Sequence, residues 1–231
     1  MSVTENYSAV CARIRSACKR AGRDPKEVTL IAVSKTKPVS MIQELLSAGQ
    51  LDFGENYVQE LHEKAQVLPE AHFHMIGHLQ RNKVKMTVGS VSMIHSVDSL
   101  RLAEEISKES VKRGIVTDVL LEINGGNEES KYGYDFSEAE EAAREMSTLP
   151  GIHIRGLMCV APFVSDPEEN RPIFRKISQL AVDIEAKNID NIEMNVFSMG
   201  MTGDFEVAIE EGATMVRVGT AIFGERVYRS N

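Results

Sequence analysis

The sequence lacks several features of secreted and membrane-spanning proteins. It contains no tryptophan and only three cysteines in 231 residues. An odd, small number of cysteines is typical of a reducing compartment. No stretch approaches the roughly 18 consecutive apolar residues that a membrane-spanning helix needs. The first residues, Ser2 to Ser8, are polar and do not form the apolar core of a secretory signal. We therefore expect a cytoplasmic protein that does not enter a membrane.

Basic residues are also in deficit, with 26 Lys and Arg against 34 Asp and Glu and a net charge of −8. This charge argues against nucleic acid or an anionic membrane as the main partner. The remaining composition, 42% hydrophobic and 26% charged, is typical of a globular domain. No linker or low-complexity segment interrupts the chain, so we expect a single domain over residues 1–231.

Short apolar runs alternate with amphipathic segments along the whole chain. After an N-terminal helix at 4–22, the pattern predicts strands at 29–35, 51–54, 72–76, 91–95, 118–124, 152–159, 194–198 and 214–218. Helices are expected after each strand, for example at 39–48, 99–113, 137–148 and 205–211. Eight successive strand–helix units predict a single (β/α)8 TIM barrel with an extra N-terminal helix. An open doubly wound sheet is the alternative, although it rarely needs eight evenly spaced units.

The first predicted strand ends on Lys35, and Pro38 is expected at the first position of the next helix. In a barrel, residues that follow the strands converge on the mouth where the chemistry takes place. Partial burial can leave a lysine amine nucleophilic, as a Schiff-base lysine requires. A lysine whose stem is buried and whose amine reaches water is the commoner interpretation of one such residue. The alternation of side-chain direction along a strand does not distinguish Lys35 from Lys37, because residues two apart point to the same side.

Small and hydroxyl-bearing residues follow the last two predicted strands, at the usual phosphate site of a barrel. Ser198, Gly200 and Thr202 come after the seventh strand, and Gly219 and Thr220 after the eighth. Glycines allow close approach of the backbone, and amides at a helix start attract anions. Each pattern alone is also typical of a plain turn. Together they predict a phosphate site.

Alternation along the eighth strand turns Arg217 towards the inside of the barrel. A buried guanidinium needs a partner, so Arg217 is expected either to hold a ligand or to pair with Glu122 or Glu55. A Schiff-base lysine, a phosphate site and an inward arginine fit one cofactor, pyridoxal 5′-phosphate. Its aldehyde, its phosphate and its pyridine nitrogen would meet these three features in turn.

The segments that carry these residues resemble the pyridoxal phosphate homeostasis proteins, also called the proline synthetase co-transcribed family, which share the barrel of the alanine racemase N-terminal domain. The matching segments are 32–38, 53–60, 74–80, 123–124, 129–133, 155–158, 198–201 and 216–224. The resemblance implies that Lys35 forms the Schiff base and that Arg217 meets the pyridine nitrogen. It implies that Asn56 and His74 line the pocket, and it assigns the phosphate to Ser198, Gly200, Gly219 and Thr220. Thr202 keeps a hydroxyl where the family usually has a serine.

The function expected from this resemblance is binding without catalysis: a protein that buffers, stores or delivers pyridoxal phosphate, with apoenzymes that depend on this cofactor as its expected partners. Racemisation needs two bases, and the resembling racemases take the second from a further domain, which we do not find in the sequence. Tyr57, Tyr132 and Tyr134 follow strand ends, but none has a residue beside it that marks it as a base. A small amino-acid racemase is the alternative function, and a signalling module that senses the cofactor is another. We expect a monomer and, despite the histidines at 72, 74 and 78, no metal site.

Overall fold

The computed structural model describes residues 2–126 and 132–225, and its strands form one closed barrel. Glu129, Ser130 and Lys131, which contribute to the resemblance, lie outside these residues. The strands pair in parallel and in sequence order: β1 Thr29–Val33, β2 Asp52–Glu55, β3 His72–Met75, β4 Met93–Val97, β5 Thr117–Ile123, β6 Ile152–Cys159, β7 Ile192–Ser198 and β8 Met215–Val218. Pairing of β1 with β8 closes the barrel, and it sets Ile31 beside Arg217 and Ala32 beside Val218.

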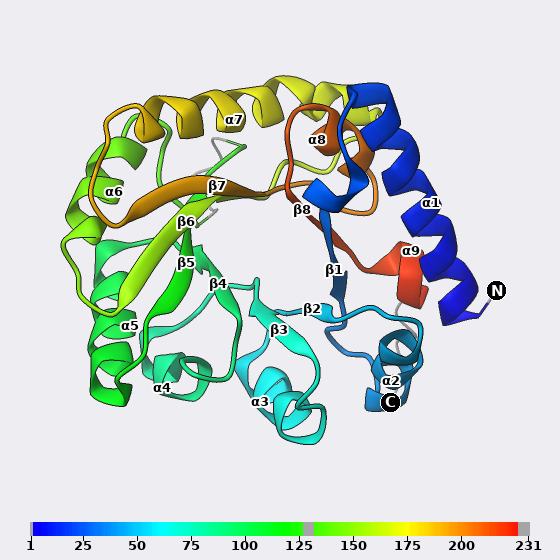
Figure 1. Ribbon diagram of the computed structural model, residues 1–231, viewed down its shortest axis with the longest axis horizontal. Coiled ribbons are helices and arrows are strands. Elements are labelled where there is room, and N and C mark those ends of the chain that lie inside the picture. Colours follow the sequence, from blue (N-terminus) through cyan, green and yellow to red (C-terminus); the bar gives the residue numbers. More distant parts are fainter. Residues whose placement is uncertain (1, 127–131, 226–231) are drawn as a thin grey trace.

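Helices surround these strands (Figure 1). The α-helices are α1 Val3–Ala21, α2 Val39–Ser47, α3 Val58–Val67, α4 Val84–Thr87, α5 Leu100–Arg113, α6 Ala139–Ser147, α7 Arg171–Glu185, α8 Phe205–Glu210 and α9 Thr220–Phe223. Three single-turn 3-10 helices, η1 Pro25–Glu27, η2 Arg81–Lys83 and η3 Pro167–Asn170, lie in the connections. No helix in the described part of the chain combines the length and the apolar character that crossing a bilayer requires.

The predicted TIM barrel is confirmed, and each predicted strand lies within a few residues of an observed one. Two boundaries near the predicted site differ. The first strand ends at Val33, so Lys35 lies in the turn that follows it. Pro38 is the residue before α2 rather than its first residue. Proline fits there equally well because its backbone is already extended, with φ −69° and ψ 153°.

The extra N-terminal helix, α1, begins at a capping box in which Ser2 and Glu5 satisfy each other's backbone amides. It packs against α8 and α9, the two helices that follow the last two strands (Figure 1). Asn6 donates to the carbonyl oxygen of Ile222 at 3.0 Å, and Arg13 pairs with Glu206 at 2.7 Å. The helix therefore supports the part of the barrel that carries the predicted phosphate site.

Two apolar layers result from the alternation of side chains along the strands. The larger lies between strands and helices and includes Phe53, Phe73, Phe174 and Phe205. The smaller, inside the barrel, consists of Met93, Leu120, Met158 and Val196. Other inward positions carry polar side chains, including His74, His95, Ser198 and Arg217. The layer between the sheet and the helices is thus apolar, whereas the inside of the barrel is partly polar.

Candidate functional site

A cavity of about 540 Å³ opens at the end of the barrel where the strands terminate. This volume lies within the range of about 300–1,000 Å³ that is typical of small-molecule sites. Its wall combines apolar residues of β1 and of the segments after β3, β6 and β7 with polar residues of β8 and of the segments that follow β1, β2, β7 and β8. Six of the nine residues predicted from the sequence contribute to this wall: Lys35, Asn56, Thr202, Arg217, Gly219 and Thr220.

Lys35 lies in a turn that the surrounding structure holds in an unusual conformation. The next residue, Thr36, has φ +62°, in the left-handed region that β-branched residues rarely adopt. Its backbone amide donates to both carboxylate oxygens of Glu60, at 2.9 and 3.0 Å. A strained residue of this kind costs about 1–3 kcal/mol and is often found beside a functional group. No pattern in the sequence predicted this strain.

A buried ion pair supports the same turn from outside the sheet. Lys64 of α3 is 4% exposed and donates to Glu55 at 2.7 Å and to the carbonyl oxygen of Ser34 at 2.8 Å. The hydroxyl of Ser34 also donates to Glu55, at 2.7 Å. Burial raises the pKa of Glu55 to about 7, although Lys64 and Ser34 act in the opposite direction. These contacts fix the backbone immediately before Lys35.

The two lysines that the sequence could not distinguish have different surroundings. The Lys37 amine donates to the carbonyl oxygens of Phe223 and Gly224, both at 3.1 Å, and of Glu225 at 3.3 Å. It thereby satisfies the free carbonyl groups at the end of α9. Lys35 instead belongs to the cavity wall. The geometry therefore favours Lys35 as the lysine that meets a ligand.

Arg217 is 4% exposed, and its described hydrogen bonds go to neutral oxygen atoms. One terminal nitrogen, Nη1, donates to the carbonyl oxygen and to the hydroxyl of Ser198, both at 2.6 Å. The other, Nη2, donates to the carbonyl oxygen of Cys159 at 2.8 Å. The expectation of an ion pair with Glu55 is wrong, because Glu55 is on the outer face of β2, bound to Lys64. Glu122 attracts Arg217 without a hydrogen bond in the described structure.

Two buried oxygen atoms near the cavity have no hydrogen-bond partner among the described residues. One is Oδ1 of Asn56, in the cavity wall, and the other is Oε2 of Glu122 on β5. A buried polar atom without a partner costs about 1–3 kcal/mol. Burial, together with the nearby Asp98, raises the pKa of Glu122 to about 7, and Arg217 lowers it. The unpaired Asn56 oxygen is where a donor group of a ligand would fit.

The predicted phosphate residues are only partly in the wall. The hydroxyl of Thr220 donates to that of Thr202 at 3.2 Å, so both threonines meet at the cavity. Gly200 lies behind them, with φ +88°, and a Cβ there would come within 2.6 Å of the Cβ of Ala208. Its glycine therefore lets α8 pack against the turn after β7. The hydroxyl of Ser198 accepts from Arg217 inside the barrel.

His74 lies below the cavity rather than in its wall. Its Nε2 is 3.1 Å from Oδ1 of Asp52, and its Nδ1 is 2.9 Å from Nε2 of His95. Nδ1 of His95 is in turn 2.9 Å from the Ser198 hydroxyl, so His95 connects two predicted residues. His95 was not predicted from the sequence. The alternation of side chains could have predicted it, because His95 takes an inward position in the fourth strand, next to the third strand, which also contains histidine.

The surroundings of two tyrosines give no catalytic base. Tyr134 donates to the sulfur of Met146 at 3.8 Å, and burial raises its pKa to about 12. The Tyr132 ring stacks on the ring of His78, with centroids 3.7 Å apart. His78 itself contacts Asp98 at 2.9 Å, away from His74. Residues 2–126 and 132–225 contain no group of three or more His, Cys, Asp or Glu arranged to hold a metal.

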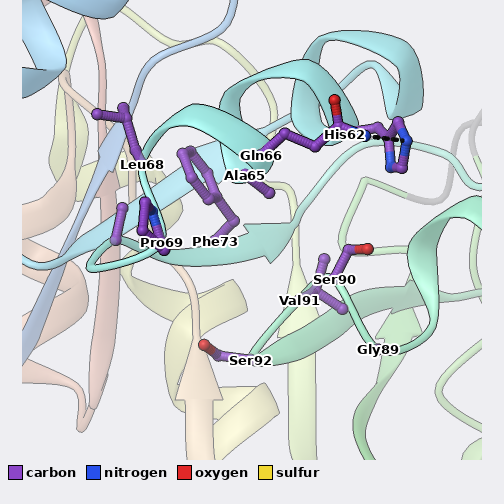
Figure 2. A pocket seen from close by; sticks show the side chains of 11 residues that line it. His62, Ala65, Gln66, Leu68, Pro69, Phe73, Gly89, Ser90, Val91 and Ser92 are labelled. Atoms are coloured by element: carbon purple, nitrogen blue, oxygen red, sulfur yellow. Dashed lines mark hydrogen bonds between the residues drawn. The ribbon is translucent and has the colours of Figure 1, made fainter.

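A second hollow, of about 410 Å³, lies in the loops that precede β3 and β4 (Figure 2). His62 and Gln66 of α3, hydrogen-bonded to each other, border it together with Phe73 and Ser90. None of the residues predicted from the sequence lines it. The predicted chemistry therefore belongs to the cavity at the opposite end of the strands.

Comparison with known proteins shows similarity over almost the full length. Residues 6–227 match the family described as alanine racemase, N-terminal domain. The pyridoxal phosphate homeostasis protein of Aquifex aeolicus is 44% identical over 230 residues, which cover 99% of this chain and 100% of that protein. A crystal structure of an unknown protein from Bifidobacterium adolescentis is 39% identical, with a TM-score of 0.91, and the match covers 96% of this chain and 94% of that one. PipY of Synechococcus elongatus, solved with PLP bound, is 32% identical with a TM-score of 0.83, and the match covers 96% and 100%.

Proposed function

The chain belongs to the family of pyridoxal phosphate homeostasis proteins, and from this premise we propose that it binds pyridoxal 5′-phosphate in the mouth cavity and buffers, stores or delivers it. The observation that carries this proposal is the cavity wall, in which Lys35 of the turn after β1 lies together with Arg217 of the neighbouring strand β8. The related PipY is described with PLP bound. The chain acts on its cofactor by holding and releasing it.

The residues of the cavity fit the functional groups of the cofactor. When bound, pyridoxal phosphate supplies an aldehyde and an electron-withdrawing ring. Lys35 would hold the cofactor through its amine, and the aldehyde would supply the reversible Schiff-base chemistry. The hydroxyls of Thr202 and Thr220, with the backbone of Gly219, hold the phosphate. Ser198 and Gly200 shape the turn behind them.

Arg217 faces the pyridine nitrogen in this proposal. A guanidinium donates hydrogen bonds and does not accept them, so it favours a ring nitrogen that carries no proton. A ring in that state withdraws electrons weakly, which suits reversible holding more than carbanion chemistry. The unpaired oxygen of Asn56 accepts a further donor from the ligand or its bound water. The described residues thus offer contacts for the aldehyde, the phosphate and the pyridine nitrogen of the cofactor.

We extend the proposal to the setting in which the protein works. Its three cysteines, an odd and small number, agree with work in the reducing cytoplasm. We propose that it acts there as a monomer. Its partners are apoenzymes that need pyridoxal phosphate. Because attachment of the cofactor to Lys35 would be reversible, the open mouth would allow its release to them.

The proposal is tested by reducing the protein with borohydride in the presence of pyridoxal phosphate and locating the adduct by peptide mass spectrometry. We expect modification of Lys35, loss of modification in Lys35→Ala, and its retention in Lys37→Ala. An adduct confined to Lys37 would overturn the assignment, and no adduct in any variant would overturn the binding proposal.

A second measurement separates binding from catalysis. The loaded protein is mixed with individual amino acids in deuterated water, and exchange of the α-proton is followed by proton NMR. We expect no exchange from a protein that carries the cofactor on Lys35. Exchange that disappears in Lys35→Ala would instead identify a racemase-like activity.

A further inference from the structure

Five polar side chains form a continuous chain through the inside of the barrel, from its floor to the mouth cavity. We call Asp52, His74, His95, Ser198 and Arg217 the inner column. Successive contacts measure 3.1 Å from Asp52 to His74, 2.9 Å from His74 to His95, 2.9 Å from His95 to Ser198 and 2.6 Å from Ser198 to Arg217. We propose that Asp52, His74 and His95 are positioning residues that hold Arg217 in its ligand-binding state.

The column is buried except at its lower end. The side chain of Asp52 is 28% exposed, whereas His74, His95, Ser198 and Arg217 are between 0% and 4% exposed. The five residues come from five different strands, β2, β3, β4, β7 and β8. Hydrogen bonds in such a dry environment are stronger than in water, and neighbouring bonds in a chain polarise one another.

The donor at each hydrogen bond of the inner column follows from the groups at its two ends, the guanidinium of Arg217 and the carboxylate of Asp52. Arg217 can only donate, so the hydroxyl oxygen of Ser198 accepts and its own hydrogen is available for Nδ1 of His95. A neutral imidazole that accepts at Nδ1 carries its hydrogen on Nε2. His95 therefore donates from Nε2 to Nδ1 of His74.

His74 repeats the same step at the lower end. Because its Nδ1 accepts, its Nε2 carries the hydrogen and donates to the carboxylate of Asp52. All four bonds then point in one direction, from a positive guanidinium to a negative carboxylate, with both rings neutral. Burial is the largest cause that lowers the pKa of His95, and His74 and Arg217 lower it further, which agrees with a neutral ring.

This arrangement explains how a buried guanidinium is stabilised without a directly bonded carboxylate. The aligned dipoles of Ser198 and the two imidazoles present negative atoms to Arg217 and hydrogen atoms to Asp52. Glu122 on β5 and two residues of the cavity wall, Lys35 and Asp204, are other charged groups near the upper end. The titratable thiol of Cys159 also acts on Arg217. The floor around Asp52 also includes His72, whose Nδ1 is 3.5 Å from the same carboxylate oxygen.

Reversing the direction of the hydrogen bonds in the inner column would disturb the site. A hydrogen on Nδ1 of His95 would donate to the Ser198 oxygen, which would then accept from both His95 and Arg217. The hydroxyl hydrogen would have to leave the column, and the bond that orients Arg217 would weaken. Asp52, although outside the cavity wall, therefore controls how firmly Arg217 faces the ligand.

The first test needs no cofactor, so it is independent of the proposed function. Nitrogen-15 NMR of the histidine rings at neutral pH should show both His74 and His95 without a hydrogen on Nδ1 and with one on Nε2. Finding either ring protonated at Nδ1 would overturn the column as described.

The second test rests on the proposed function and uses pyridoxal phosphate itself. Asp52→Asn removes the charge that anchors the column, and Asp118→Asn makes the same change elsewhere on the floor, where Asp118 lies 3.7 Å from Arg155. We expect Asp52→Asn to weaken binding about threefold to tenfold and to shift the absorbance of the bound cofactor. We expect Asp118→Asn to change neither.

Equal affinities and spectra for Asp52→Asn and the unmodified protein would overturn the proposal. Thermal unfolding of both variants without cofactor separates this effect from loss of fold, since a structural role alone would lower stability without moving the spectrum. If the unmodified protein bound no pyridoxal phosphate, the proposed function would fail while the ring measurement would still decide the tautomers.

Discussion

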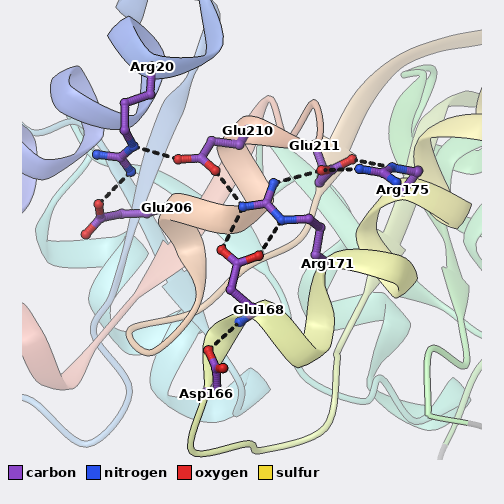
Figure 3. A network of polar contacts seen from close by, with 8 residues as sticks. All are labelled: Arg20, Asp166, Glu168, Arg171, Arg175, Glu206, Glu210 and Glu211. Atoms are coloured by element: carbon purple, nitrogen blue, oxygen red, sulfur yellow. Dashed lines mark hydrogen bonds and ion pairs between the residues drawn. The ribbon is translucent and has the colours of Figure 1, made fainter.

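The protein has two extended polar networks in opposite environments. The inner column lies inside the sheet, and an outer network of arginines and glutamates joins α1, α7 and α8 on the surface (Figure 3). In the outer network Arg171 binds Glu168, Glu210 and Glu211, and Arg20 binds Glu206 and Glu210. Both networks have short contacts, so contact length alone does not distinguish them.

Exposure distinguishes them. The side chains of Arg20 and Arg175 are 48% and 70% exposed, so water and salt weaken their ion pairs. Arg217 is nearly inaccessible, and each of its bonds replaces a lost contact with water. The outer arginines therefore connect elements at small energetic gain, whereas Arg217 satisfies buried oxygen atoms of Ser198 and Cys159.

The largest expected effect is that of removing the inner guanidinium. Arg217→Met leaves the buried carbonyl oxygens of Ser198 and Cys159 without their donors. We expect the free energy of unfolding to fall by about 3–5 kcal/mol, because each lost bond to a charged donor is worth about 1.5–3 kcal/mol. Urea denaturation at neutral pH measures it. The matched control, Arg20→Met, should cost less than about 1 kcal/mol. Equal losses would contradict the comparison.

A second prediction concerns Glu122, whose pKa is raised from 4.5 to about 7, mainly by burial. Between these values the folded state binds more protons than the unfolded chain, so the free energy of unfolding falls as the pH rises through this window. Glu122→Gln removes this dependence. The difference in free energy of unfolding between Glu122→Gln and the unmodified protein should therefore shift in favour of the variant by on the order of 3 kcal/mol as the pH rises from 4.5 to about 7. Urea denaturation across the window measures the gain, and a difference independent of pH would contradict the prediction.

The smallest effect is expected in the outer network. Arg171→Gln removes an arginine that is 25% exposed and contacts three glutamates, so we expect a loss of about 1 kcal/mol at low salt. Because salt screens exposed charges, the loss should shrink as sodium chloride is raised towards 1 M, where the screening length falls to about 3 Å. The Arg217→Met loss should change little over the same range. If the loss for Arg171→Gln did not depend on salt, dissolved ions would not screen this network, and the contrast with the inner column would fail.

Much of the fold and part of the site could be predicted because they depend on local patterns. Alternation of apolar runs and amphipathic helices located the strands, and the barrel rule then placed Lys35, Gly219 and Thr220 at one mouth. Alternation also turned Arg217 inwards. It could not identify the bonding partners of Arg217, because these come from β6 and β7 through the register of the closed sheet.

Local sequence patterns specify the number and order of the strands, the side chains that face inwards and the residues that follow each strand, because side-chain direction repeats with a fixed local period. Which of those residues contact one another depends on the closed barrel. His95 and Ser198 are 103 residues apart and touch only because the barrel is closed and narrow. The strained turn at Thr36 and the assignment of Lys37 to the end of α9 likewise depend on neighbours distant in sequence. Contacts across the barrel follow from closure and register, which no local pattern encodes.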